Sequence, residues 1–319
     1  MAAVLKPGWS KPSNILFAAE LPANEKAFDF ALAQAVEYGA KLILFHAYDT
    51  LVVTESEASG LRYYDPAAAS RIELEHLEPL AQRVRKAGIE CETVVRQGLA
   101  AEQILAYLSE REIDRIVMGT HSPGPLGKLL VGSVAEAVLR AAHAPVCVIG
   151  PEAVSGKYRN FATRTILCAV SLHESSPLVV SFAALLAAEE NARLILQHVI
   201  RPQDRQELLA GRSLDQINDD MLAMVPDELE GKVTVQSIIV QGEPTEELLY
   251  HSLSEQADLV VLGAQGASAF AAIACHGVVY KLLAHSHCPV MTLSPLVLAA
   301  CDGKAEKPHP AEVFLAGVF

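Results

Sequence analysis

The chain has 319 residues, of which 51% are hydrophobic and 20% charged, and its formal net charge is -13 at pH 7. This composition predicts a globular protein rather than a disordered one, and the acidic balance, without clustered lysine and arginine, argues against nucleic acid as a partner. The six cysteines form no C-x-x-C pair and no stretch of about 18 residues is continuously apolar, so we expect a cytoplasmic protein with reduced thiols and no membrane span.

In the first half, short apolar runs alternate with helical patterns along the chain. Runs that are apolar throughout are typical of strands buried on both faces, and helices between them are typical of a parallel sheet covered on both sides. We therefore predict a five-stranded doubly wound α/β domain. Its predicted strands are Ile15–Ala19, Leu42–Ala47, Cys91–Val95, Ile116–Met118 and Val146–Ile149, and its predicted helices are Glu25–Tyr38, Ala67–Lys86, Ala101–Arg111 and Ser133–Ala141.

The second half repeats the first. The block Ile113–Ile149 is similar to Ala257–Leu293, and Gly119 aligns with Gly263. Repetition at this length predicts two copies of one domain rather than a solenoid. The predicted strands of the second copy are Ile166–Val170, Leu194–Val199, Val233–Val240, Leu259–Leu262 and Val290–Leu293.

We predict domains at residues 1–150 and 164–294, followed by a tail at 295–319. Because the segment between the domains is short, the halves are expected to pack against each other. The last strand of each half is apolar and expected at a sheet edge, where its unpaired backbone groups invite a partner strand.

Two segments do not follow the alternation of strand and helix. Thr50–Pro66 is a long polar connection that we expect to form a surface excursion. The tail ends in the apolar sequence VFLAGVF, and the sequence leaves open whether it is frayed or docked through Phe314 and Phe319.

A glycine-containing segment, Gly119–Ser133, leaves the fourth predicted strand and runs into a helix. Doubly wound sheets place ligands at the carboxyl ends of their strands, where the strand order reverses. Glycines let backbone amides approach an anion there, and a helix N-terminus adds partial positive charge, so the segment suits a phosphate. An alternative stays open, because Ser133 and Glu136 form an S-x-x-E capping box that would simply start a helix.

This segment, the strand-end opening of each half and the apolar helix leading to a short A-P-V strand resemble the universal stress protein family, whose loop pattern is G-x2-G-x9-G-[ST]. The resemblance covers about Asn14 to Leu293. It implies a flavodoxin-like, adenine nucleotide alpha hydrolase-like fold with strand order 3-2-1-4-5. Nucleotide-binding members hold ATP with this loop, with an acidic residue after the first strand and with residues at the end of the second strand.

In the first half the resemblance transfers with departures. Ser122 stands in place of the second loop glycine and Glu20 in place of aspartate, and Pro123 and Pro125 lack an amide hydrogen to donate to phosphate. Lys128 is the only cation inside the loop. The implied nucleotide-binding residues are Ala18, Glu20, Ala47, Met118, Gly119, Ser122, Lys128, Gly132, Ser133 and Val134.

The second half departs further from the family pattern. His276 occupies the closing glycine position, and residues 264–276 contain no lysine or arginine to offset the charge of a triphosphate. We expect this site to be vacant or repurposed. Its aligned residues are Ser171, Val199, Gly263, Gly266, His276 and Gly277.

Histidines and cysteines do not predict a metal centre. His285, His287 and Cys288 follow one another too closely for a recognised zinc pattern. His46 and His198 close the second strands and are expected to be structural. The only expected cofactor is ATP or another adenine nucleotide, with no metal apart from Mg²⁺ carried by that nucleotide.

Two functions stay open. The first is a regulatory module whose amino-terminal half binds an adenine nucleotide, and the second is a nucleotide-independent interaction or scaffold protein with degenerate sites in both domains. Hydrolase, zinc-protease and P-loop motifs are missing from the sequence, so we expect no catalytic residues and at most weak ATP hydrolysis. We expect an intramolecular pseudo-dimer of the two domains and a homodimer of the whole chain, with a protein partner that the sequence does not identify.

Overall fold

The computed structural model describes residues 7–49, 53–55, 62–64, 66–120, 132–154, 163–206, 211–263 and 271–301. The first half contains a parallel sheet in the order β5-β2-β1-β6-β7. Counted along the chain these strands have the order 3-2-1-4-5, as the sequence predicts. Their bounds are β1 Asn14–Ala18, β2 Lys41–Tyr48, β5 Cys91–Gln97, β6 Arg115–Gly119 and β7 Val146–Ile149.

The second half has the same topology, with strands in the order β10-β9-β8-β11-β12. The predicted fold class, two repeated doubly wound domains, is therefore confirmed, and most predicted strand ends move by only one or two residues. The bounds are β8 Thr165–Ala169, β9 Arg193–Ile200, β10 Val235–Gln241, β11 Leu259–Gly263 and β12 Val290–Leu293.

The helices cover both faces of the sheet. Helix α2 begins after Asn24, whose side chain accepts a hydrogen bond from the amide of Ala27, and it ends at Gly39, which has a positive φ of 62°. The first-half helices are α1 Pro7–Ser10, α2 Glu25–Tyr38, α3 Pro66–Lys86, α4 Ala100–Glu110 and α5 Ser133–Ala141. The second-half helices are α6 Ser176–Glu190, α8 Leu214–Leu222, the 3-10 turn η2 Asp227–Leu229, α9 Pro244–Ser254, α10 Ala271–His285 and α11 Pro295–Cys301.

Each face of the sheet carries one apolar core. One core lies under α2, α3, α6, α8 and α11, and it includes Phe17, Phe28 and Phe182. The other lies under α4, α5, α9 and α10, and it includes Phe45 and Leu282. Both cores contain residues of both halves, so the halves share their interior.

The two sheets join through their last strands. β12 pairs antiparallel with β7, with Met291 opposite Cys147, and this pairing makes one ten-stranded sheet. The hydroxyl of Ser294 also donates to the carbonyl of Ala142 at 2.6 Å. A side chain at Gly150 would collide with the carbonyl of Leu283 on α10. The predicted intramolecular pairing of the edge strands is therefore confirmed, and β5 and β10 form the two ends of the joined sheet.

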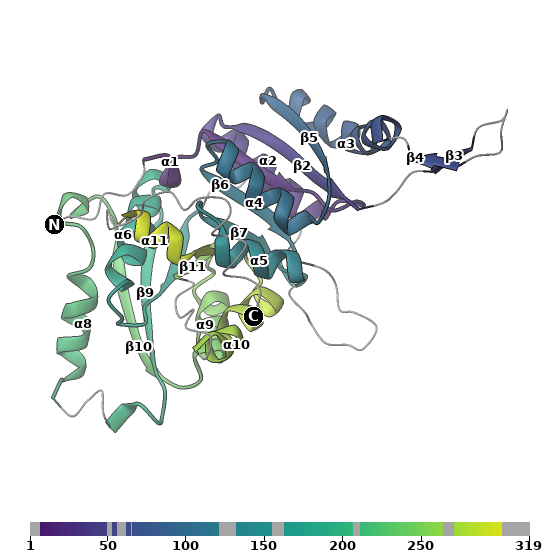
Figure 1. Ribbon diagram of the computed structural model, residues 1–319. Coiled ribbons are helices and arrows are strands. Elements are labelled where there is room, and N and C mark those ends of the chain that lie inside the picture. The colour runs from purple at the N-terminus through teal and green to yellow at the C-terminus, as the bar shows by residue number, and fades with distance from the viewer. Residues whose placement is uncertain are drawn as a thin grey trace.

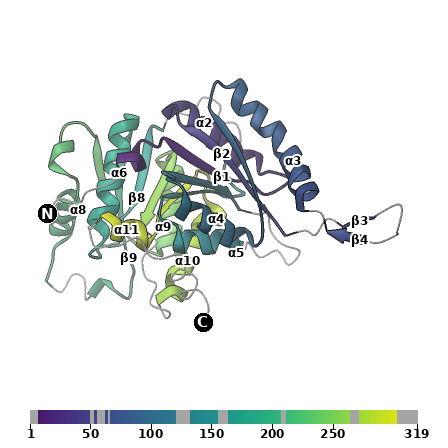
Figure 2. The same cartoon turned by 45° about the horizontal axis from the view of Figure 1, so that its top comes forward.

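An antiparallel pair that the sequence does not predict, β3 Val53–Glu55 with β4 Arg62–Tyr64, lies away from the ten-stranded sheet (Figure 1). In both views α3 and α8 lie at opposite ends of the molecule (Figure 1 and Figure 2). The tail begins with α11, whereas Phe314 and Phe319 lie outside the described residues. None of the helices that the structure describes has both the length and the apolar character that crossing a bilayer requires.

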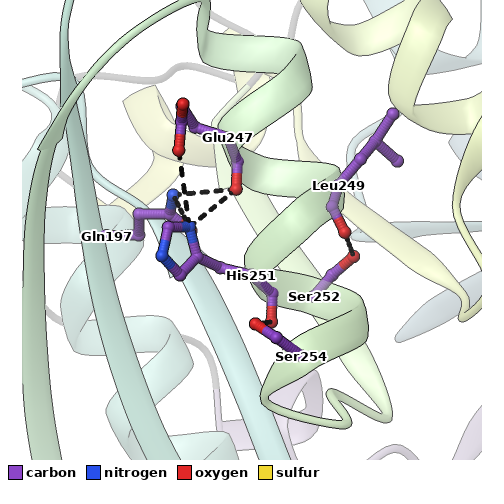
Figure 3. A network of polar contacts seen from close by, with 6 residues as sticks. All are labelled: Gln197, Glu247, Leu249, His251, Ser252 and Ser254. Carbon is purple, nitrogen blue, oxygen red and sulfur yellow. Dashed lines mark hydrogen bonds and ion pairs between the residues drawn. The ribbon is translucent and has the colours of Figure 1, made fainter.

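Equivalent core positions carry different chemistry in the two halves. Phe45, the fifth residue of β2, packs on Tyr107 of α4 with ring centroids 5.3 Å apart. At the same positions β9 and α9 carry Gln197 and His251, whose Nε2 and Nδ1 atoms lie 3.0 Å apart (Figure 3). Gln197 Nε2 also donates to the carbonyl of Glu247 at 3.1 Å. The buried Oε1 of Gln197 has no hydrogen-bond partner among the described residues.

Candidate functional site

The site predicted in the first half lies where the strand order reverses between β1 and β6. Parallel pairing sets Ala18 of β1 beside Met118 of β6, and Gly119 follows one residue later. Ala18 and Ala47 are partly buried at the border of the core that also includes Val134 of α5. The structure thus brings these predicted residues to one rim of the sheet, and Glu20 extends from the same rim as an exposed side chain.

Asn24 bridges the rim. Its Oδ1 accepts from the amide of Ala27 at 3.1 Å, and its Nδ2 donates to the carbonyl of Thr120 at 3.4 Å. A Cβ at Gly119 would lie 2.5 Å from that Nδ2. Gly119 is therefore needed for the close approach of Asn24, a reason that does not depend on any ligand.

Lys26 lies two residues after Asn24, in the first turn of α2. Its Nζ donates to the carbonyl of Pro151 at 2.7 Å, just beyond the end of β7. The amide of Thr120 donates to the carbonyl of Ile149 at 3.1 Å, so the ends of β6 and β7 are tied together beneath it. An ammonium group therefore lies beside the segment that follows β7.

Helix α5 begins at the closing pair of the predicted loop. Gly132 is its N-cap residue, with φ of -60° and ψ of 151°, and within the described residues no side chain caps the helix. The predicted capping box of Ser133 and Glu136 is therefore wrong, because Ser133 is already inside the helix and Glu136 instead pairs with Arg140 at 2.7 Å. The exposed first turn has backbone amides from which an anion could accept hydrogen bonds.

Between these points the predicted loop is not described. Ser122, Lys128, Pro123 and Pro125 all lie in 121–131, outside the described residues. The first-half site is thus defined by its two ends, Gly119 and Gly132, and by the side chains around them.

The second-half rim has a different local chemistry. Ser171 is exposed, and its hydroxyl lies 3.1 Å from that of Ser176 in the first turn of α6. Val199 and Gly263 are partly buried at the ends of β9 and β11, whereas Gly266 lies outside the described residues. No charged side chain is aligned with Glu20 or Lys26, because Ser171 and Pro177 take those positions.

The helix that follows β11 starts earlier than the alignment predicts. α10 begins at Ala271, so His276 and Gly277 lie inside it rather than at its N-terminus. Their amides are therefore in positions where a helix uses them for its own hydrogen bonds. The pair aligned with Gly132 and Ser133 therefore does not stand at a helix start in the second half.

The two strand-end histidines hold neighbouring strands together. His46 Nδ1 donates to the carbonyl of Ala19 at 2.8 Å, and His198 Nδ1 donates to that of Val170 at 2.7 Å. Burial lowers the pKa of His198, although the hydrogen bond to Val170 opposes the shift. Both contacts agree with the structural interpretation, although the buried Nε2 of His198 has no hydrogen-bond partner among the described residues. In the described part of the chain no group of three or more histidine, cysteine, aspartate and glutamate side chains could hold a metal ion.

A small cavity of about 170 Å³ lies at the opposite edge of the first sheet. It is lined in part by Lys41 and Glu92, whose charged groups lie 2.6 Å apart. The hydrogen bond to Lys41 lowers the pKa of Glu92, and Tyr107 donates to the same carboxylate at 3.2 Å. Because these charges already neutralise each other, and ligands of parallel sheets bind at the carboxyl edge, the cavity is not the candidate site.

Sequence reasoning missed Asn24 and Lys26. The Asn-Glu-Lys run at residues 24–26 signals a helix start, which explains Asn24 as a cap but not its contact with Thr120. The contact between Lys26 and Pro151 joins residues far apart in sequence, and no local pattern reports it.

Comparison with known proteins gives consistent matches over both halves. The model of the "Universal stress protein family" matches residues 12–150 and 162–294. Universal stress protein YxiE of Bacillus subtilis is 28% identical over 133 residues, which cover 40% of this chain and 90% of that protein. A universal stress protein of Thermus aquaticus is 30% identical over 131 residues, 39% of this chain and 88% of that protein. Each of these relatives therefore aligns with less than half of the chain.

Several solved structures span both halves. The crystal structure of a universal stress protein from Archaeoglobus fulgidus covers 90% of this chain and 97% of its own, with a TM-score of 0.68 and 18% identity. At that identity the likeness concerns the fold.

Proposed function

The chain belongs to the universal stress protein family, and from this membership we propose that it is a stress-response regulatory protein whose amino-terminal half binds ATP or another adenine nucleotide. Nucleotide binding to that half would alter a surface that a protein partner recognises. The protein is proposed to work by binding, in the cytoplasm, with at most weak hydrolysis of ATP.

The observation that carries this proposal is the start of α5. Gly119 ends β6, Gly132 immediately precedes α5, and no side chain in the described part of the chain caps that helix. A phosphate placed between these glycines would meet free amides and the positive end of the helix dipole. Support also comes from the apolar rim of Ala18, Ala47 and Val134, which suits the flat face of an adenine.

The second half is proposed to leave nucleotide unbound. The amides of His276 and Gly277 belong to α10, and the aligned rim carries Ser171 and Pro177 in place of charged side chains. Any Mg²⁺ would arrive with the nucleotide in the first half rather than on a resident set of ligands.

A specific contact favours the second candidate, a nucleotide-independent interaction protein. Asn24 already spans the rim from α2 to Thr120 and lies against Gly119, so it fills space near the first loop glycine. A nucleotide must fit beside that side chain or displace it.

We keep the division at 1–150, 164–294 and 295–319 and the homodimer of the whole chain as proposals. Because β7 and β12 already pair with each other, a homodimer must use other surfaces, such as the end strands β5 and β10. The mass of the native protein in solution tests this directly.

The nucleotide proposal is tested by native mass spectrometry of freshly purified protein and then by calorimetric titration with ATP. We expect co-purified nucleotide or a binding isotherm with one site per chain. Gly132→Val should weaken binding by at least about tenfold, since a branched side chain would cover the amides that approach phosphate. The backbone of Gly132, at φ of -60°, is open to any residue, so this variant is expected to fold.

The matched control is His276→Val, which changes the aligned position of the second half and should leave ATP binding intact. The absence of both a bound mass and heat at millimolar ATP would reject the nucleotide proposal in favour of the interaction protein. Equal loss in both variants would instead indicate that the second half contributes to binding.

A further inference from the structure

The two ring nitrogens of His46 have different surroundings. Nδ1 lies 2.8 Å from the carbonyl oxygen of Ala19, just after β1. Because a carbonyl oxygen only accepts hydrogen bonds, Nδ1 carries a hydrogen whatever the charge of the ring. The neutral ring of His46 therefore has its lone pair on Nε2.

The Nε2 atom of His46 faces a carboxylate. It lies 3.6 Å from Oε2 of Glu73 on α3, and only 11% of the His46 side chain and 17% of the Glu73 side chain are exposed. A neutral ring sets two acceptors against each other here, whereas a proton on Nε2 turns the same contact into an ion pair. Because both side chains are largely buried, salt screens this pair less than a surface pair. The contact is therefore complete only when His46 is protonated.

Two further contacts join the same segments and do not require a charged ring. His76 Nδ1 lies 3.1 Å from the same Oε2 of Glu73, but 56% of its side chain is exposed, and a neutral histidine can donate from Nδ1. The hydroxyl of Tyr48, at the end of β2, lies 2.9 Å from that of Ser70 on α3. The contact between His46 and Glu73 differs from both because protonation completes it.

Three elements besides α3 border His46. On β1, the exposed Glu20 follows Ala19, and on β5 the residue opposite His46 is Val95. On α2, the carboxylates of Glu25 and Asp29 accept from Arg83 of α3 at 2.7 and 2.5 Å. Among the described residues, the carboxylate recorded in contact with Nε2 of His46 is that of Glu73.

The second half has the equivalent histidine without the carboxylate. His198 Nδ1 lies 2.7 Å from the carbonyl of Val170, and its buried Nε2 has no hydrogen-bond partner in the described part of the chain. Burial lowers the pKa of His198, the hydrogen bond to Val170 opposes this shift, and the positive charge of Arg212 adds to it. The two halves therefore offer opposite surroundings to a proton at the same position of the strand.

We propose that His46 and Glu73 form a pH-operated latch, in which His46 takes up a proton on Nε2 as the pH falls and the resulting ion pair fastens α3 to the carboxyl end of β2. Histidine is the side chain whose charge ordinarily changes between about pH 5 and pH 8. When α3 is docked the proton faces Glu73, and when α3 opens the ring faces water. Docking is therefore strengthened as the pH falls and weakened as it rises. The latch belongs to the first half alone and does not depend on nucleotide binding by that half.

The test is hydrogen exchange of the full chain at pH 6 and pH 8, measured by mass spectrometry on peptides from α3 and α8 and corrected for the intrinsic effect of pH on exchange. We expect the amides of wild-type α3 to be about tenfold better protected at pH 6 than at pH 8, the size of one charge-assisted hydrogen bond. Helix α8, which covers the same face of the sheet in the second half, is the internal control and should gain no protection at pH 6.

Three variants assign the effect to residues. Glu73→Gln should give α3 equal protection at both pH values, because the amide group of glutamine can donate to the neutral ring. His46→Asn keeps a donor for the carbonyl of Ala19 but cannot take up a proton, so α3 should be poorly protected at both pH values. The matched control is His76→Gln, which removes the exposed histidine beside Glu73 and should keep the wild-type dependence on pH.

Three results would overturn the proposal. Equal protection of wild-type α3 at both pH values would show that no proton is linked to its docking. Loss of the dependence in His76→Gln, with its retention in Glu73→Gln, would assign the proton to the exposed histidine. A change in α8 as large as that in α3 would show that pH acts on the stability of the whole chain. If His46→Asn does not fold, the comparison of Glu73→Gln with His76→Gln still decides.

Discussion

The two halves differ most at the connection between the fourth strand and the helix that follows. In the first half the helix waits until Ser133, after a segment that contains proline and several glycines, whereas in the second half it already begins at Ala271. The sequence Ala-Ala-Ile-Ala-Cys that opens α10 has a high helix propensity, which explains the earlier start. The same topology can therefore place a helix N-terminus where a ligand could contact it in the first half, whereas in the second half the equivalent residues lie inside the helix.

The interior of the halves differs as well. The first residue of β6 is Arg115, which is 1% exposed, and the first residue of β11 is Leu259. The aromatic pair Phe45 and Tyr107 becomes the polar pair Gln197 and His251. Equivalent positions thus carry a polar side chain once in the first half, at Arg115, and twice in the second, at Gln197 and His251. Buried polar groups stabilise only when their partners are complete, so these positions allow the comparison to be tested.

The largest effect is expected at Arg115. Its guanidinium donates to Gln34 and to the carbonyl of Trp9 and lies over the ring of Tyr38. Burial lowers the pKa of Arg115 to about 10, so it stays charged at neutral pH. Arg115→Ala should lower the free energy of unfolding by about 3–5 kcal/mol, because it leaves a void and two acceptors without donors.

Urea unfolding followed by circular dichroism measures this loss. Arg115→Leu, which installs the residue of the second half, should lose only about 1–2 kcal/mol, because it fills the void and removes a buried charge. An equal loss in both variants would mean that the hydrogen bonds to α1 and α2, rather than volume, dominate at this position.

A smaller effect is expected for the polar pair of the second half. The double variant Gln197→Phe with His251→Tyr reproduces the first-half pair and removes the buried Oε1 that has no partner in the described part of the chain. We expect it to be about 1–2 kcal/mol more stable than the wild type. The single variant Gln197→Phe should gain less, since it leaves the polar ring of His251 beside an apolar side chain instead of Gln197.

A double-mutant cycle on thermal or urea unfolding separates the coupling of the two positions. The matched control is the reverse exchange in the first half, Phe45→Gln with Tyr107→His, which should be destabilising. Simple addition of the two single effects would show that the second-half pair does not act as a unit.

The strands and the pairing of the two halves can be predicted from the sequence because they depend on which segments are apolar throughout, whereas the strand order 3-2-1-4-5 is implied by the resemblance to the family. The runs around Val146 and Val290 are apolar along their whole length, and both prove to be fully buried where the sheets meet. The bounds of α2 are also predictable, since Asn24 and Gly39 are residues that favour the two ends of a helix.

The site is less accessible to sequence reasoning because its contacts join segments that are far apart. Aligning His276 with Gly132 assumes that both halves start the helix at the same point, and this alignment overlooks the helix propensity of the preceding alanines. The burial of Arg115 is not predicted because the predicted strand starts at Ile116, the first apolar residue. The position of Lys26 over Pro151 follows only from the packing of α2 across β6 and β7.

The smallest effect concerns the last residues of α2 and α6, which meet across the two halves. Tyr38 donates its hydroxyl hydrogen to the carboxyl of Glu190. Burial, and to a lesser extent the nearby Glu37 carboxylate, raises the pKa of Glu190 to about 7. An acid whose pKa is raised on folding contributes full stability below its unfolded value of 4.5 and loses it as the pH rises through the folded value.

Glu190→Gln cannot ionise, so it should be more stable than the wild type at pH 8, where the wild-type carboxylate is charged. Because Glu190 is only partly buried, solvent screening reduces the gain to about 1 kcal/mol, and at pH 5 the two proteins should differ little. Glu189→Gln, at an exposed neighbouring position, serves as the control and should show no such dependence on pH. Urea unfolding at both pH values checks this, and a gain of equal size at pH 5 and pH 8 would show that ionisation of Glu190 does not weaken the contact between α2 and α6.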